Sequence, residues 1–119
     1  MQAFDEYVSS EDPNYQWVEH EDLRFQSLFK GDGYVLNVTS QKWLNESIVW
    51  GPDGALWTHQ VVIVIPKDLK YTNVSVAYLT GGCNESPNKP VDPSLKGNHD
   101  LAIVDEIAHN SFSIGIMVN

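Results

Sequence analysis

The stretch from Val61 to Cys83 decides the fold of this chain. It reads VVIVIP at 61–66, then a polar connection, then VSVAYLTGGC at 74–83. The first segment has five consecutive β-branched residues, a pattern typical of a strand that is buried on both faces. The second segment ends in two adjacent glycines, as a central strand does where backbone must approach a site closely. The stretch therefore predicts part of a layered α/β domain.

The residues before this stretch are expected to add antiparallel strands. LRFQSLF at 23–29 and YVLNVTS at 34–40 flank the turn sequence KGDG at 30–33, which predicts a hairpin. The alternation within 34–40 indicates a strand with one more apolar face, near a sheet edge. Residues 1–24 are expected to form an acidic N-terminal arm that has one short helical turn and then an extended segment.

The residues after Cys83 predict a crossover. Residues 82–97 contain three prolines and read as a loop, and Asn98 then stands where a helix N-cap is favoured. An amphipathic helix of about 12 residues is expected to follow, because apolar side chains recur at helical spacing. SIGIMV at 113–118 reads as another strand. A strand, helix and strand in this order form a parallel β-α-β unit.

The predicted elements include too few helices to cover both faces of the sheet. The order is strand-strand-strand-helix-strand, an α/β arrangement in which residues 1–119 form a single partial domain with a mixed sheet. The three most apolar strands need cover on both faces, whereas one helix covers one face. The uncovered sheet face is expected to meet either the remainder of a longer chain or a second copy, as in a homo-oligomer.

Composition excludes several classes of partner. The 119 residues carry a formal net charge of −9, which repels nucleic-acid backbones and anionic membrane surfaces. No apolar run approaches the roughly 18 residues that a membrane span needs, so membrane insertion is not expected. We therefore expect no nucleic-acid partner and no membrane insertion.

Four Asn-x-Ser/Thr sequons mark candidate glycosylation sites at Asn37, Asn45, Asn73 and Asn84. With nine asparagines and 14 serines and threonines in the chain, chance predicts about one sequon. The excess favours a secreted, extracellular glycoprotein. The alternative is that asparagine and serine gather in loops for structural reasons alone.

The only stretch that suggests chemistry is Gly81-Gly82-Cys83. Glycines after a central strand let backbone N–H groups approach a ligand, so these three residues are oxyanion-loop candidates. The alternative is a tight turn that needs a positive φ. No nucleophile elbow, phosphate-binding loop or metal-ligand spacing occurs, so we assign no catalytic residue, metal or cofactor.

The N-terminus resembles a known family. FDEYV at 4–8 followed by DPNYQW at 12–17 is similar to the opening of the PhoPQ-activated pathogenicity-related protein family. TSQKWL at 39–44, WTH at 57–59 and GGCN at 81–84 continue the resemblance. It covers essentially the whole chain.

The resemblance implies an α/β-hydrolase-like fold of which this chain is the N-terminal part. A nucleophile, an acid and a histidine would then lie C-terminal to Asn119. For the family's amoebal branch of autocrine proliferation repressors, it implies a secreted signal that restrains proliferation and repels cells through a cell-surface receptor. The alternative function is a serine hydrolase or peptidase with its oxyanion loop at 81–83.

Overall fold

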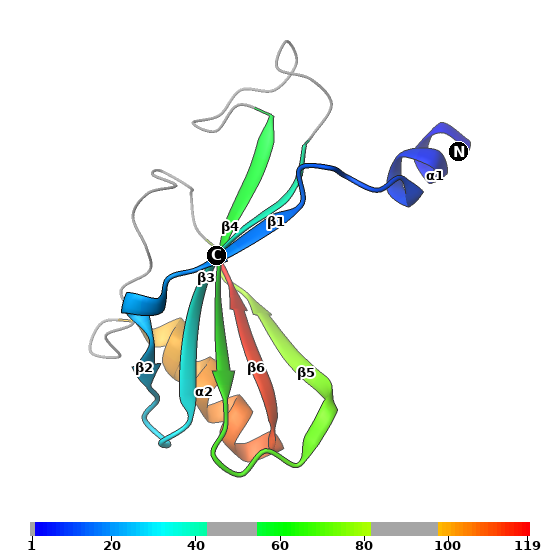
Figure 1. Ribbon diagram of the computed structural model, residues 1–119. Helices are drawn as coiled ribbons and strands as arrows, with labels where there is room; N and C mark the ends of the chain where they lie inside the picture. The colour runs from blue at the N-terminus through cyan, green and yellow to red at the C-terminus, as the bar shows by residue number, and fades with distance from the viewer. Residues whose placement is uncertain (1, 43–54, 82–97) are drawn as a thin grey trace.

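The computed structural model describes residues 2–42, 55–81 and 98–119 (Figure 1). It confirms a mixed α/β protein in which a six-stranded sheet carries one long helix. In chain order the elements are α1 (Gln2–Ser9), β1 (Gln16–Glu19), the 3-10 helix η1 (Glu21–Leu23), β2 (Phe25–Gln26), β3 (Asp32–Lys42), β4 (Leu56–Ile65), β5 (Tyr71–Leu79), α2 (His99–Ser111) and β6 (Ser113–Val118).

The strand order is β1-β3-β4-β6-β5, and β2 also pairs with β3. β5 and β6 are parallel, as the crossover predicted, and the other pairs are antiparallel. β6 lies between β4 and β5, so two strands that are consecutive in the chain do not pair with each other. As a result β5 is an edge strand, and the expectation that it is central was wrong for the part of the chain that the structure describes.

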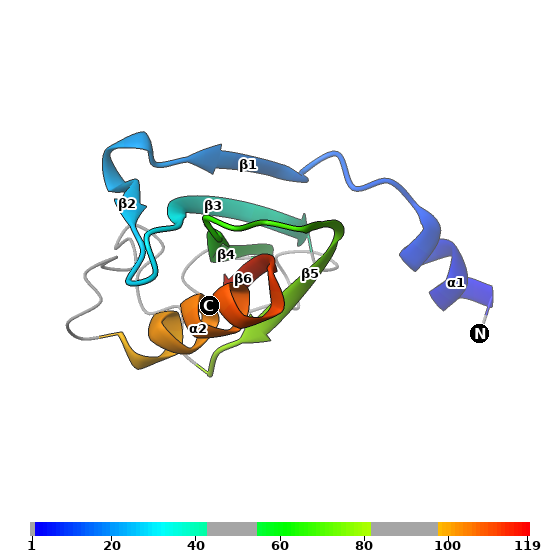
Figure 2. The ribbon, with the colours of Figure 1, turned by 90° about the horizontal axis from the view of Figure 1, so that it is seen from below.

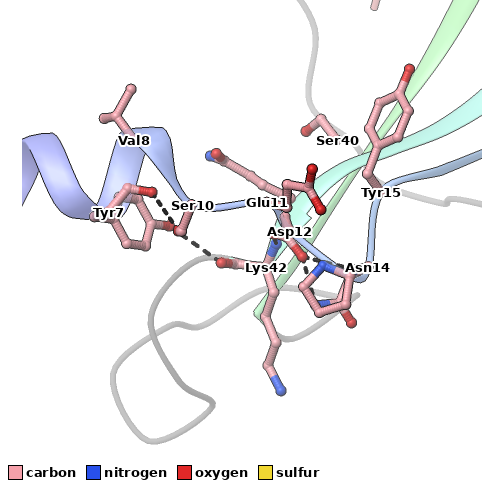
Figure 3. Close-up of a pocket in the computed structure, with 11 residues that line it drawn as sticks. Tyr7, Val8, Ser10, Glu11, Asp12, Asn14, Tyr15, Ser40 and Lys42 are labelled. Atoms are coloured by element: carbon pink, nitrogen blue, oxygen red, sulfur yellow. Dashed lines mark hydrogen bonds between the residues drawn. The ribbon is translucent and has the colours of Figure 1, made fainter.

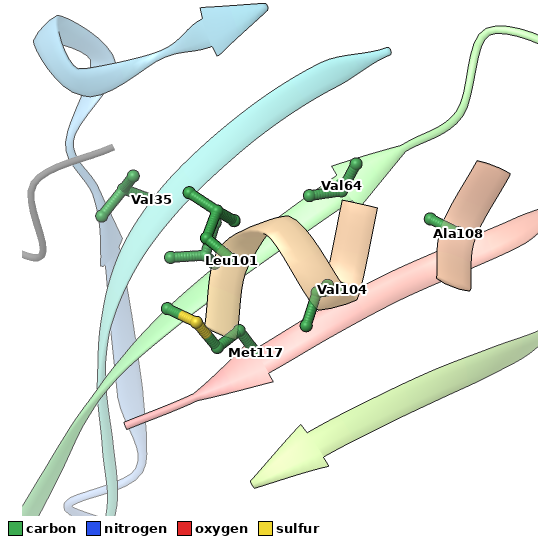
Figure 4. Packing of buried hydrophobic residues seen from close by; sticks show 7 residues of the cluster. Val35, Val64, Leu101, Val104, Ala108 and Met117 are labelled. Carbon is green, nitrogen blue, oxygen red and sulfur yellow. The ribbon is translucent and has the colours of Figure 1, made fainter. Parts of the chain in front are cut away.

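Helix α2 covers one face of this sheet. Asn98 caps it by accepting a hydrogen bond from the Leu101 N–H at 3.0 Å, as the sequence predicted. Figure 1 shows α2 behind the sheet, and Figure 2 shows it on one side of the curved sheet, with α1 projecting away from the other end. The buried cluster between helix and strands comprises Val35, Val62, Val64, Leu101, Val104, Ala108 and Met117 (Figure 4).

Burial on both faces, expected for 61–65, is found on one face only. Val62 and Val64 are fully buried under α2, whereas Val61, Ile63 and Ile65 are only partly buried. Five consecutive β-branched residues indicate that both faces can be buried, but a second layer is needed to do it. None of the elements in the described ranges lies on that second face.

β3 lies in the interior of the sheet, contrary to the expectation of an edge. Residues 16–19 of the acidic arm form β1 and pair with β3 on the side away from β4, with Trp17 opposite Val38. A strand of four residues with mixed polarity gives little signal in sequence. Its position depends on the partner strand that it meets.

The hairpin is present, but its turn lies earlier than predicted. The Lys30 N–H donates to the Ser27 carbonyl at 3.0 Å, and the Ser27 N–H donates to the Gly31 carbonyl at 2.9 Å. The turn therefore spans 27–31, and only Phe25 and Gln26 remain for the first strand. Gly33 is a strand residue instead, paired with Phe25 and Val64. The Phe25 ring occupies the space where a Cβ would be, which explains glycine at this position.

Replacing Lys30 with glycine is expected to stabilise the protein by about 1 kcal/mol. Lys30 adopts φ 62°, a left-handed conformation that a Cβ disfavours and that glycine adopts without cost. Thermal unfolding followed by circular dichroism measures the change. Lys30→Ala is the matched control, because it removes the charge and keeps the Cβ. Equal melting temperatures for the two variants would contradict this account.

Candidate functional site

The face of the sheet opposite α2 is a continuous apolar surface. Residues that pair across neighbouring strands of a sheet lie on the same face. On this face they form two rows that cross the strands in the order β3, β4, β6 and β5. We call this surface the open face. It comprises Tyr34, Leu36, Val61, Ile63, Ala77, Leu79, Ile116 and Val118, all partly or fully exposed.

Aromatic side chains extend the open face at one end. Trp17 pairs with Val38, and Val38 pairs with His59. The Trp57 and His59 rings meet edge-on, with centroids 6.4 Å apart. Trp17 is 59% exposed and Trp57 is 46% exposed. Large exposed aromatic side chains beside an apolar surface are typical of residues that anchor a protein partner.

A charged pair lies at the β1 rim of the open face. Arg24 Nε donates to Glu19 at 2.6 Å, and the guanidinium lies 5.5 Å from the centroid of the Tyr34 ring. The hydrogen bond from Arg24 lowers the pKa of the Glu19 carboxyl below its usual range. The pair keeps the positive charge of Arg24 compensated beside the apolar surface.

A second feature is a pocket of about 520 Å³ between the end of α1 and the end of β3 (Figure 3). Asp12 joins its two sides: the carboxylate accepts from the Lys42 N–H at 2.6 Å and from the Asn14 N–H at 2.8 Å. The Tyr7 hydroxyl donates to the Lys42 carbonyl at 3.3 Å. These contacts fasten the N-terminal arm to the sheet, so the pocket is explained as a structural junction.

Residues 2–14 of the arm are expected to loosen from the end of β3 in acid, while β1 stays paired. The hydrogen bonds from the Lys42 and Asn14 backbone lower the pKa of Asp12 below its ordinary value of 3.8. The carboxylate form therefore holds the arm, and this contribution is present above pH 3.8 and lost as pH falls through the lowered pKa. The NMR shift of the Lys42 amide proton reports the step.

Asp12→Asn is the matched control, because it keeps the shape of the side chain and one of the two acceptor oxygens and does not titrate. A Lys42 amide that responds to acid equally in both proteins would contradict the role of Asp12.

A serine–histidine contact lies near this pocket, and sequence analysis missed it. Residue 40 is the extra residue of a β-bulge, where Thr39 pairs with Thr58 and Gln41 pairs with Trp57. The bulge turns Ser40 Oγ to within 3.1 Å of His59 Nε2. However, Ser40 Oγ also donates to the Trp57 carbonyl at 3.2 Å, and the single hydroxyl proton cannot serve both partners. No carboxylate in the described ranges orients His59, so this contact is not a catalytic triad.

The structure places one of the three oxyanion-loop candidates. Gly81 follows the end of β5, where the Thr80 N–H donates to the Val118 carbonyl at 2.9 Å. The space around Gly81 is open within 4 Å of a Cβ, and its φ is outside the left-handed region. Neither crowding nor backbone conformation therefore explains glycine at this position. Gly82 and Cys83 lie outside the described residues.

Two of the four sequon asparagines have described positions. Asn73 lies on exposed β5, and Asn37 lies in the interior strand β3 with its Oδ1 buried. Asn45 and Asn84 lie outside the described residues. No group of three potential metal ligands occurs within 2–42, 55–81 and 98–119. No helix in these ranges is long and apolar enough to cross a membrane.

Comparison with known proteins places the chain in a family. The model of the PhoPQ-activated pathogenicity-related proteins matches residues 4–118. The chain belongs to this family. It is also 31% identical over 113 residues to autocrine proliferation repressor protein A of Dictyostelium discoideum. The match takes in 94% of this chain and 20% of that relative's length. No solved structure matches the chain significantly.

Proposed function

We propose that this chain is the N-terminal portion of a secreted signalling protein that restrains the proliferation of the cells that release it. The observation that carries the proposal is the 31% identity to a protein named an autocrine proliferation repressor, across nearly the whole chain. An autocrine factor must leave the cell before it acts. The excess of sequons supports this extracellular location.

The partner that this function requires is a cell-surface receptor, through which the protein also repels cells. The exposed Trp17 and Trp57 support a protein partner, since aromatic side chains dominate the energy of protein interfaces. Binding of labelled protein to living cells measures this step. Saturable binding that Trp17→Ala weakens at least tenfold is expected. Binding that is unsaturable and unchanged by the substitution would contradict a specific receptor.

We infer that residues 1–119 are a single partial domain, the N-terminal part of an α/β-hydrolase-like sheet with the acidic arm at 1–24. The parallel β5-α2-β6 crossover and the open space beside Gly81 support this interpretation. In this proposal the remainder of a longer chain covers the open face. The match takes in only 20% of the relative's length, which supports a longer chain. The alternative occupant is a second copy of this chain.

Analytical ultracentrifugation distinguishes whether the remainder of the chain or a second copy covers the open face. The 119 residues alone are expected to self-associate through the open face, because contact between a contiguous apolar surface and water is unfavourable. The natural protein is expected to be longer and monomeric. A sharp monomer from the 119 residues at high concentration would contradict the exposed open face.

Loss of the gene tests the proposed function itself. Cells of the source organism that lack the protein are expected to divide faster and to reach a higher density than parental cells. Their conditioned medium is expected to have lost the ability to slow fresh cultures. Unchanged growth and unchanged medium would overturn the proposal.

The alternative is a serine hydrolase whose catalytic residues lie C-terminal to this chain, which the open space beside Gly81 favours. A fluorophosphonate probe tests it on the natural protein. Labelling of one serine, with hydrolysis lowered by Gly81→Pro, would support an enzyme. An unlabelled protein would exclude it.

A further inference from the structure

We propose that the fold selects Asn73 as an N-glycan attachment site and excludes Asn37. The inference rests on the proposed secretion of the protein, since N-glycans are added in the secretory pathway. It goes further, because a sequon pattern alone treats Asn37-Val38-Thr39 and Asn73-Val74-Ser75 alike. The structure separates them by their positions in the sheet.

Asn73 lies at the centre of a break in the β5–β6 ladder. Tyr71 pairs with Ser113, and Ser75 pairs with Ile114. Ser113 and Ile114 are consecutive on β6, so residues 72–74 of β5 have no partner there. β5 is also the edge strand, which leaves its other side without a neighbour among the described strands. All five residues from 71 to 75 are exposed. A large substituent on Asn73 therefore displaces nothing.

Asn37 has the opposite surroundings. It lies in β3 between Val18 of β1 and Gln60 of β4 and pairs with both. Its Oδ1 is buried, and Thr39 of the same sequon is 8% exposed. The Asn37 side chain stands on the face of β3 that also carries the buried Val35 and Thr39, so a glycan on this amide would have to displace the neighbours that bury its Oδ1. Burial of the Asn37 amide oxygen and a glycan on the same amide therefore exclude each other.

The chemistry needs a co-reactant of one class, an oligosaccharide linked through a diphosphate to a lipid. The Asn73 Nδ2 forms a bond to the anomeric carbon of the sugar. The bond from that carbon to the diphosphate oxygen breaks, the lipid diphosphate leaves, and Nδ2 loses one proton. The Ser75 hydroxyl completes the sequon that the transferase recognises.

The experiment compares sequons within one protein. The chain is produced in a eukaryotic secretory host behind a cleavable leader, and the natural protein is purified from its source. Enzymatic deglycosylation converts each occupied asparagine to aspartate, which peptide mass spectrometry locates. Ser75→Ala and Asn73→Gln remove the Asn73 sequon at exposed positions. Thr39→Val, which removes the Asn37 sequon, is the matched control.

In the host, Asn73 is expected to be occupied and Asn37 empty. Ser75→Ala and Asn73→Gln are each expected to lower the mass of the protein by one glycan. Thr39→Val is expected to leave the number of glycans unchanged. An unmodified Asn73, or an occupied Asn37 in folded secreted protein, overturns the inference. Glycans elsewhere on the natural protein with a bare Asn73 also overturn it while leaving secretion intact. A natural protein without glycans that stays inside cells overturns the proposed function as well.

Discussion

Gly115→Val is expected to destabilise the protein by more than about 3 kcal/mol, enough to remove most of the stability of a small domain. Gly115 lies in β6 directly under α2. A Cβ at this position would lie 2.9 Å from the Val104 carbonyl oxygen and 3.0 Å from the Ala108 Cβ. One of these contacts is helix backbone, which cannot move aside as a flexible side chain would. The helix would have to lift from the buried cluster.

Urea unfolding followed by far-ultraviolet circular dichroism measures the effect on Gly115→Val. Gly81→Ala is the matched control, since the same added methyl group meets open space there and is expected to change stability by less than about 0.5 kcal/mol. Gly115→Ala is expected to lie between the two. Equal urea midpoints for Gly115→Val and the parent would show that α2 does not approach β6 this closely.

Asp105→Ala is expected to cost about 2 kcal/mol. Asp105 is 1% exposed, and its carboxylate accepts the Leu28 N–H at 2.7 Å. This bond joins the middle of α2 to the 27–31 turn, which lies 77 residues earlier in the chain. Hydrogen bonds to charged groups contribute roughly 1.5–3 kcal/mol, and their removal leaves the backbone donor without its partner.

Asp105→Asn separates the hydrogen bond from the charge, because an amide oxygen of the same shape can still accept from Leu28 N–H. It is expected to lose less than half as much stability as Asp105→Ala in thermal unfolding. Equal losses from asparagine and alanine would mean that the buried charge, rather than this bond, holds the turn against α2.

The sequence predicted elements whose signals are local. The apolar run at 61–65, the N-cap Asn98 and the alternating strand at 113–118 each specify structure within a few neighbouring residues. The parallel β5-α2-β6 unit followed from their order alone. The open face was predicted too, because one helix cannot cover both sides of such apolar strands.

Features that depend on distant residues were not predictable in the same way. β6 lies between β4 and β5, and all three strands are apolar. Their composition therefore does not reveal which strand pairs with which. The Asp12–Lys42 junction and the Ser40–His59 contact each need a side chain placed by a partner strand. The turn at 27–31 was displaced because Lys30 adopts a conformation that sequence patterns assign to glycine.

We propose that the natural protein acts from outside the cell to slow proliferation. The most direct test adds purified natural protein at increasing concentration to cells that lack the gene, and counts cells over several doublings. We predict a saturable, dose-dependent fall in the doubling rate, and no effect from a Gly115→Val protein that has lost its fold. A doubling rate that stays constant at every concentration of folded protein would contradict the account.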